Sequence, residues 1–350
     1  MDSQNKNPLS LQPDLSLFDP ATSDEKQSLV IMRESVGFWR DGFRRLRKNN
    51  IAMISFVIIV IILFFAFIVP SFYPYDYKTQ VRGSEKLGMM EYSAAEQERI
   101  DAGEFVLPHF LGTDTLGRDI TVRIMMGSRI SLLVGIVASL IVMVIGSLYG
   151  AISGYFGGRL DQFMMRFVDM VYTVPDLLII ILLAAVLGDP IQALADGNPA
   201  FAWMNTIGEA LISIFIIFAL LYWVGMARII RSQILTLKEL EYVTAARALG
   251  ASSARIIMKH LLKNCIGLVI VTTTLQIPSA IFTETFLSFA GLGVKAPMPS
   301  LGSMASDALS GMSSYPHWLL APALMISLII LSFNLFGDGL RDAFDPKLKK

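Results

Sequence analysis

The residues of this sequence that could do chemistry are ionisable side chains inside long apolar stretches. Arg166, Asp169 and Asp176 occur in "RLDQFMMRFVDMVYTVPDLL" at i, i+3 and i+10, and Thr173 at i+7 completes one helical stripe. Charges in an apolar segment are costly and face a bundle interior, a partner or a cavity. Two interpretations stay open: an ion pair between Arg166 and Asp169, or a role in gating or in a transport pathway.

A lone carboxylate lies in another apolar stretch. Glu284, in "AIFTETFLSFAGLG", is surrounded by Thr283, Thr285 and Ser288. Such a group either accepts a hydrogen bond from a neighbouring helix or lines a pore, and the sequence favours neither.

Catalytic and metal chemistry have little support in the sequence. His109, His260 and His317 are far apart in the chain, and none belongs to an HExxH pattern. Cys265 is the only cysteine, which excludes an intramolecular disulfide and a cysteine cluster. No GxxxxGK phosphate loop occurs, so neither a nucleotide, another cofactor nor a metal is expected in this chain. An intramembrane enzyme is the least supported hypothesis.

The elements that must position these charges are membrane helices. Hydrophobic residues make up 54% of the 350 positions, only 17% are charged, and mean hydropathy is +0.57. Uncharged apolar stretches of about 18 residues or more are typical of membrane spans. The sequence therefore predicts an all-α polytopic membrane protein with about six transmembrane helices, at 51–69, 130–155, 163–187, 211–227, 265–289 and 319–336.

The remaining segments divide the chain around these spans. A polar tail is expected at residues 1–37. An amphipathic membrane-surface helix follows at 38–50, with Phe38, Trp39 and Phe43 at the interface. A long outer loop is expected at 70–129. Within that loop, "FLGTDTLGRDI" is turn-rich, with either a local structural role or a contact to an external partner. Residues 130–337 form a core of five helices, and 338–350 a second tail.

Positive charge predicts the orientation. With the amino terminus inside, most of the 29 Lys and Arg residues fall in inner segments, and the short outer segment 188–210 has none. Both termini and segment 227–264 are therefore expected in the cytoplasm. Formal charge is balanced at 29 basic and 29 acidic residues, so no footprint for nucleic acid is expected.

Small residues recur at helical spacing in "GSLYGAISGYFGG". Gly146, Gly150 and Gly154 lie four residues apart, which places them on one helix face. Such a face lets another membrane helix approach closely. Close packing is the favoured interpretation, and a gate hinge is the alternative.

The stretch 239–264 predicts a helix, a tight turn and a second helix between two spans. Gly250 suits a left-handed cap after the first helix, and Ser252 or Ser253 can cap a second helix running to about Lys263. One face of the first helix has small side chains and is therefore flat, and Tyr242 and Leu249 are larger side chains that can contact a partner. This composition favours a docking element over a packed core.

Part of this stretch, "TAARALGASSARIIMKHLLKN", resembles the EAA motif of importer-type ABC permeases. Ala245, Ala246, Gly250 and Leu262 match the motif. Three residues depart from it: Thr244 stands for its Glu, His260 for its Ile and Lys263 for its Pro. Three more segments, "LGTDTLGRDI", "GYFGGRLDQFMMRFVDMVYTVP" and "LSFAGLGVKAPMPSLGSMASDAL", resemble the C-type permease of oligopeptide and dipeptide importers.

The resemblance implies a type I ABC importer permease fold with a cytoplasmic coupling (EAA) helix, in the bacterial cell membrane. It further implies a homologous B-type permease, two ABC ATPase subunits that bind the ATP and Mg, and an extracytoplasmic peptide-binding protein as partners. Nickel or a metallophore is the alternative substrate within this family. An ion-coupled secondary transporter is a more distant alternative, because it predicts inverted repeats that the sequence does not clearly contain.

Overall fold

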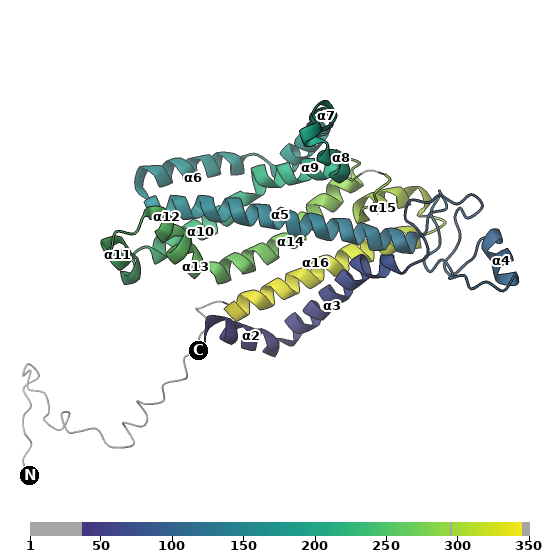
Figure 1. The fold of residues 1–350 in the computed structure, drawn as a ribbon, viewed down its shortest axis with the longest axis horizontal. Helices are drawn as coiled ribbons and strands as arrows, with labels where there is room; N and C mark the ends of the chain where they lie inside the picture. The colour runs from purple at the N-terminus through teal and green to yellow at the C-terminus, as the bar shows by residue number, and fades with distance from the viewer. Residues whose placement is uncertain (1–36, 295, 345–350) are drawn as a thin grey trace, which may run out of the picture.

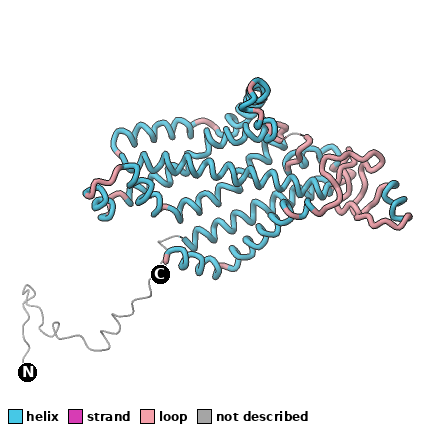
Figure 2. Tube along the Cα trace, viewed as in Figure 1, coloured by secondary structure: helices cyan, strands magenta, loops and turns pink. Residues whose placement is uncertain are grey.

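The computed structural model describes residues 37–294 and 296–344, and these residues are folded mainly into helices (Figures 1 and 2). The predicted all-α class is confirmed, because the described residues form only isolated β-bridges, Glu91 with His109 and Thr113 with Asp119. The tail predicted at 1–37 lies, apart from Gly37, outside the described residues. The surface helix predicted at 38–50 is α2, Phe38–Lys48.

Six helical segments are long and apolar enough to cross a membrane. They are Asn50–Ser71 (α3, Asn50–Phe67, with a short turn), Ile120–Phe156 (α5), Asp176–Gly197 (α7), Glu209–Leu237 (α9, Glu209–Ile217, a π-helical turn at Phe218–Tyr222 and α10, Trp223–Leu237), Ile266–Phe289 (α14) and His317–Phe344 (α16). The predicted number of spans is therefore confirmed.

The shorter helices connect these spans. They are α4 (Ala94–Asp101), α6 (Gly158–Thr173), α8 (Trp203–Ile207), α11 (Glu241–Ala248), α12 (Ser253–Arg255), a π-helical turn at Ile256–Leu261, α13 (Leu262–Asn264) and α15 (Leu301–Ala308). Together α11, α12 and α13 occupy the stretch in which a helix, a turn and a second helix are predicted.

The third span differs from the prediction of one helix at 163–187. The chain forms two helices there, α6 ending at Thr173 and α7 starting at Asp176, and Val174 between them is extended at φ −83° and ψ 134°. A residue before proline is disfavoured from helical geometry, so Pro175 separates the two helices. The membrane span is α7, and α6 is a separate helix beside α5 (Figure 1).

Two other boundaries also differ. The outer loop predicted at 70–129 ends earlier, because Asp119 caps α5 by accepting a 2.9 Å hydrogen bond from the Val122 amide. The tail predicted from residue 338 is helical up to Phe344. Leu340, Ala343 and Phe344 are buried there against Leu46 of α2, and this packing extends the last helix.

Helix α5 is the central element of the bundle, and it packs against α10, α14 and α3. One apolar core lies around α5, α10 and α14, and includes Ile214, Phe218 and Ile230. A second lies around α3, α5 and α16, and includes Ile59 and Leu132. These two cores hold α5 on both sides.

The predicted glycine face of α5 lies against α10. A Cβ atom at Gly146 would approach the Trp223 carbonyl oxygen at 2.8 Å, one at Gly150 would collide with the Ala227 carbonyl oxygen, and one at Gly154 would lie 3.0 Å from that of Arg231. No larger side chain fits between these backbones without separating them. This geometry supports the close-packing interpretation, and the hinge interpretation remains a prediction.

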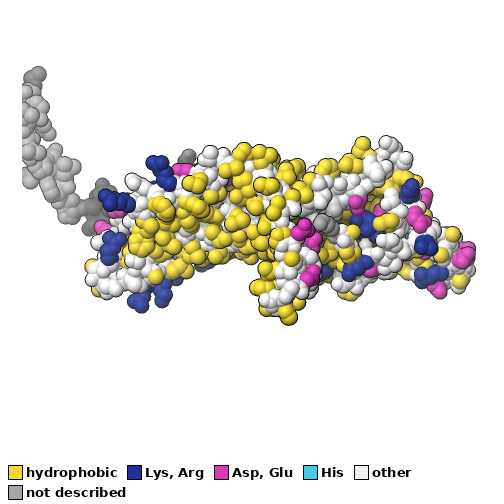
Figure 3. Space-filling model, turned by 90° about the horizontal axis from the view of Figure 1, so that it is seen from above, with side chains coloured by type: hydrophobic (Ala, Val, Ile, Leu, Met, Phe, Trp, Pro, Cys, Tyr) yellow, Lys and Arg dark blue, Asp and Glu magenta, His cyan; other side chains and the backbone are white. Residues whose placement is uncertain are grey.

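The two ends of the bundle carry different segments. The loop between α3 and α5, with α4, lies at one end; α2, the end of α16 and α11 lie at the other (Figure 1). A broad hydrophobic surface separates charged side chains at the two ends (Figure 3). This distribution matches a protein whose middle lies in lipid.

Candidate functional site

The loop between α10 and α14 forms a compact projection at the end of the bundle. Its first helix, α11, ends at a turn in which Gly250 has φ +81°. The Ala251 amide donates a 3.0 Å hydrogen bond to the carbonyl of Ala246, five residues earlier in the chain. This bond is typical of a helix that ends at a left-handed glycine. Ser252 then caps α12 by accepting a 3.4 Å hydrogen bond from the Arg255 amide. The predicted roles of Gly250 and Ser252 are therefore present.

A few apolar side chains fix this projection to the bundle. Val243, Ile256 and Leu261 are fully buried in the core around α5 and α10. Tyr242 accepts a 3.0 Å hydrogen bond from the Asn264 side-chain amide, which joins the two helical parts. The projection is thus held in place without a core of its own.

The exposed surface of α11 has small side chains between the charged Glu241 and Arg247, and Leu249 follows the helix. Thr244 and Ala245 are exposed, Ala246 is half-buried, and Leu249 is 89% exposed. In the second helical part of the projection, Leu262 lies in a shallow groove of about 510 Å³ with Met258, Lys259, Lys263 and Ile266. The projection therefore offers a large apolar side chain and a groove to a partner.

The second helical part ends without the motif proline. A π-helical turn at Ile256–Leu261 is followed by α13, and Cys265 breaks the helix at φ −90° and ψ −2° before α14 begins. Cys265 is buried, and the helix break falls at this residue although Lys263 stands where the motif has proline.

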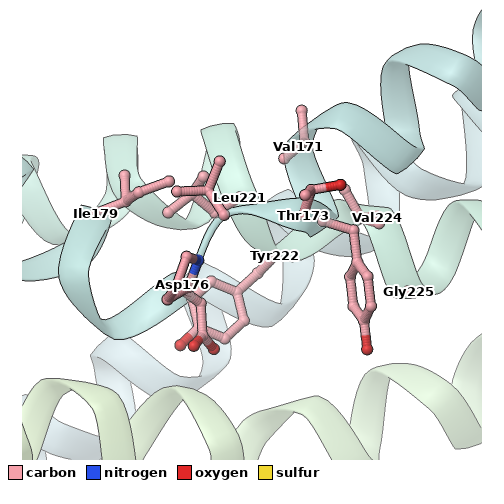
Figure 4. A pocket seen from close by; sticks show the side chains of 11 residues that line it. Val171, Thr173, Asp176, Ile179, Leu221, Tyr222, Val224 and Gly225 are labelled. Carbon is pink, nitrogen blue, oxygen red and sulfur yellow. The ribbon is translucent and has the colours of Figure 1, made fainter.

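A cavity of about 420 Å³ lies at the break between α6 and α7 (Figure 4). Its lining comes from Val171 to Asp176 and Ile179 on one side, and from Leu221, Tyr222, Val224 and Gly225 on the other. Asp176 therefore lines a cavity, and a role in a transport pathway is one of the two interpretations that the sequence left open for this residue. Its carboxylate accepts a 2.9 Å hydrogen bond from the amide of Leu177.

The predicted stripe of Arg166, Asp169 and Asp176 is wrong, because the break at Pro175 places Asp176 on another helix. The predicted pair of Arg166 with Asp169 is also absent from the described residues. Asp169 instead forms an ion pair with Arg228 of α10, with 2.8 Å between Asp169 Oδ1 and Arg228 Nη2. The Arg228 guanidinium also lies 4.5 Å from the centre of the Tyr172 ring. Helical spacing could not reveal this partner, which comes from another span.

Glu284 is fully buried inside the chain. Its carboxylate accepts hydrogen bonds of 2.7 Å from Ser131 of α5 and 2.8 Å from Ser288 of α14. The structure therefore shows the hydrogen bond to a neighbouring helix, and in this conformation Glu284 lines no open path.

Comparison with known proteins agrees with this architecture. The family profile for the binding-protein-dependent transport system inner membrane component matches residues 146–350. The chain belongs to this family of transport permeases. A second profile, the N-terminal TM domain of oligopeptide transport permease C, matches residues 37–88.

Several characterised permeases are similar to this permease along nearly its whole length. The oligopeptide transport system permease protein OppC of Bacillus subtilis is 40% identical, over 96% of this chain and 98% of the relative. The dipeptide transport system permease protein DppC of the same organism is 40% identical, over 91% and 89%. OppC of Haemophilus influenzae is 39% identical, over 90% of each chain. The secondary-transporter and metal-transport alternatives are not favoured.

The permease also contains an ion pair that sequence reasoning missed. Asp161, near the start of α6, is buried and accepts two hydrogen bonds of 2.5 Å from the Arg231 guanidinium of α10. Ser153 of α5 donates a third, also of 2.5 Å. A bidentate pair of this kind fixes α6 to α10. The two residues are 70 positions apart, and no periodicity in one sequence connects them.

The outer loop of the permease contains a buried histidine between two carboxylates. His109 Nδ1 lies 2.6 Å from Asp119 Oδ2, and its Nε2 lies 3.2 Å from Glu96 Oε1. Its ring stacks on Tyr75 with centres 4.3 Å apart. Burial by itself lowers the pKa of His109, but the hydrogen bond and charge of Asp119, followed by those of Glu96, raise the pKa above its ordinary value.

A second buried cluster lies next to that histidine. Asp114 accepts hydrogen bonds from the Leu116 and Arg118 amides, a 2.7 Å bond from Arg118 Nε, and one from Arg123 Nη1. Arg123 also contacts Asp307 of α15 at 3.3 Å. The turn-rich segment therefore has the local structural role that was one of its two interpretations.

Proposed function

We propose that this permease is a membrane subunit of an ATP-driven importer for oligopeptides or dipeptides in the bacterial cytoplasmic membrane. The exposed projection formed by α11, with Leu249 at its tip, is the observation that carries this proposal. Importers of this type have their ATPases on separate chains, and this sequence contains no phosphate loop. Peptide as the substrate is supported by the names of the oligopeptide and dipeptide permeases to which the chain is similar.

The assembly that we propose contains a homologous B-type permease, two ABC ATPase subunits and an extracytoplasmic peptide-binding protein. Tyr242, Thr244, Ala245, Ala246, Leu249, Gly250 and Leu262 form the ATPase-coupling surface. Both chain termini and α11 lie in the cytoplasm, and the loop with α4 faces the binding protein. Closure of the ATPases on ATP moves α11 and shifts the bundle toward an outward-open state.

Uptake measurements test this function. Proteoliposomes containing the permease with its co-expressed partners are expected to take up a labelled oligopeptide only when ATP and the binding protein are both supplied. Uptake of nickel ions in place of peptide would contradict the proposed substrate. Peptide uptake that follows an ion gradient and needs no ATP would contradict the proposed mechanism.

A further inference from the structure

The cavity between α6 and α7 is polar at one end and apolar at the other. Asp176, Tyr222 and Thr173 contribute oxygen atoms, whereas Ile179 and Leu221 form an apolar wall. The side chains of Asp176 and Tyr222 point the same way, with their oxygens next to each other in Figure 4.

Two membrane spans line the cavity, one at its middle, Glu209–Leu237, and the other at its first residues, Asp176–Gly197. Residues Leu221 to Gly225 occupy the centre of the span Glu209–Leu237. The Tyr222 hydroxyl also shares a 2.9 Å hydrogen bond with Thr283 of α14, so a third helix supports this wall. Asp176 thus lies beside the middle of the neighbouring span, where a carboxylate is costly unless it faces water, a partner or a ligand, and its side chain is exposed.

No lysine or arginine lines this cavity. The nearby Arg228 pairs with Asp169 and covers the Tyr172 ring, so its charge is already compensated. The only hydrogen bond that Asp176 accepts among the described residues comes from Leu177. The cavity therefore has a net negative charge and unused acceptor capacity, since a carboxylate has about four acceptor positions.

We propose that this cavity binds a primary ammonium group of the transported peptide, with Asp176 as its counter-ion. This inference rests on the proposed peptide import. The α-amino group of a peptide has an ordinary pKa of about 7.7–8.0, so it is mainly charged at neutral pH, and it donates three hydrogen bonds. Asp176 accepts one or two of them, the Tyr222 hydroxyl beside it can accept another, and Ile179 and Leu221 contact the first side chain.

Transport of peptides that differ only in their ammonium group tests this site. The probes are trialanine, N-acetyl-trialanine, and an N-acetylated tripeptide with a central lysine, each at a concentration that saturates the binding protein. Loss of one charge-assisted hydrogen bond is worth about a tenfold change. In Asp176→Asn, the ratio of kcat/KM for trialanine to that for N-acetyl-trialanine is expected to fall about tenfold, and Asp176→Glu is expected to keep most of it.

Asp189→Asn is the matched control, because Asp189 is exposed on the same helix and does not line the cavity. It is expected to keep the wild-type ratio. If Asp176→Asn also reduces transport of the lysine peptide, the site accepts any primary ammonium group; if it reduces only trialanine, the site is specific for the peptide amino terminus. Either result supports the proposal.

An unchanged ratio in Asp176→Asn would overturn the proposal, whether transport of both peptides is kept or both lose transport equally. ATP hydrolysis stimulated by peptide-loaded binding protein is measured in every variant. It is expected to persist, which shows that the complex has assembled. Failure of the proposed function would instead appear as absence of ATP-dependent peptide uptake in the wild-type complex.

Discussion

The two loops at opposite ends of the permease differ in whether they bury charged residues. The outer loop buries two clusters of three charged residues, His109 with Asp119 and Glu96, and Asp114 with Arg118 and Arg123, whereas its pair Arg99–Glu104 is exposed. The projection with α11 exposes Glu241 and Arg247 and buries apolar side chains such as Val243. The outer loop is therefore organised by contacts within the chain, whereas the projection leaves its surface available to a partner.

This difference teaches which side of the permease depends on other subunits. Both loops carry an almost fully exposed large apolar residue, Leu249 at 89% and Phe105 at 88%. Around Phe105 the rest of the outer loop is fixed by buried ion pairs. Leu249 follows a helix with mainly small exposed side chains, and this combination supports our proposal that the ATPase binds there.

The largest expected effect comes from removing the central carboxylate of the outer loop. Asp114→Ala leaves Arg118 and Arg123 buried without their shared counter-ion, which is expected to lower the free energy of unfolding by about 3–5 kcal/mol. Glu241→Ala, in the exposed projection, is expected to change it by less than about 0.5 kcal/mol. Thermal unfolding of the purified permease in mild detergent measures both, and equal effects would remove the contrast between the loops.

A smaller effect concerns pH and the outer loop. The pKa of His109 is higher in the folded loop than its ordinary value of about 6.5. Protonated His109 therefore contributes its full stabilisation of the folded loop below about pH 6.5, and this contribution is lost as the pH rises through the higher pKa of the folded state. His109→Gln is expected to cost about 1.5–3 kcal/mol at low pH and progressively less at high pH. Hydrogen exchange of residues 91–119 across this pH range measures the difference, and a pH-independent cost would contradict the account.

The smallest effect is expected at the cap in the projection. Ser252→Ala removes the acceptor for the Arg255 amide and is expected to cost about 1 kcal/mol locally, seen as faster hydrogen exchange at 253–257. Ser253→Ala is the matched control, since no hydrogen bond involves its side chain among the described residues. Similar exchange in the two variants would show that the cap does not order this turn.

Local chemistry allowed much of the fold to be predicted from the sequence. Apolar length gave six spans, Gly250 and Ser252 marked the turn after α11, and spacing placed three glycines on one face of α5. The errors occurred where tertiary contacts decide. Pro175 separates two helices that one apolar run had joined, and Phe344 extends α16 because Leu46 of another helix covers it.

The candidate site was predicted less completely, for the same reason. Sequence spacing can propose only partners on the same helix, so a pair with Arg166 is one of the two interpretations of Asp169, whereas its partner Arg228 comes from a different span. The bond between Glu284 and Ser131 spans 153 positions. Asp176 was identified because any charge in an apolar segment is conspicuous, but its cavity is visible only once α6 and α7 are separated.

The most direct test of the central claim compares the two exposed apolar residues. The tagged permease, with Leu249→Asp or Phe105→Asp or unchanged, is purified in mild detergent from its own host, and the proteins that accompany it are identified by mass spectrometry. The unchanged and Phe105→Asp chains are expected to bring a second permease and two ATPases, and Leu249→Asp to bring the second permease without the ATPases. Full recovery of the ATPases with Leu249→Asp, or purification of the unchanged chain alone, would contradict the assignment of α11 as the coupling surface.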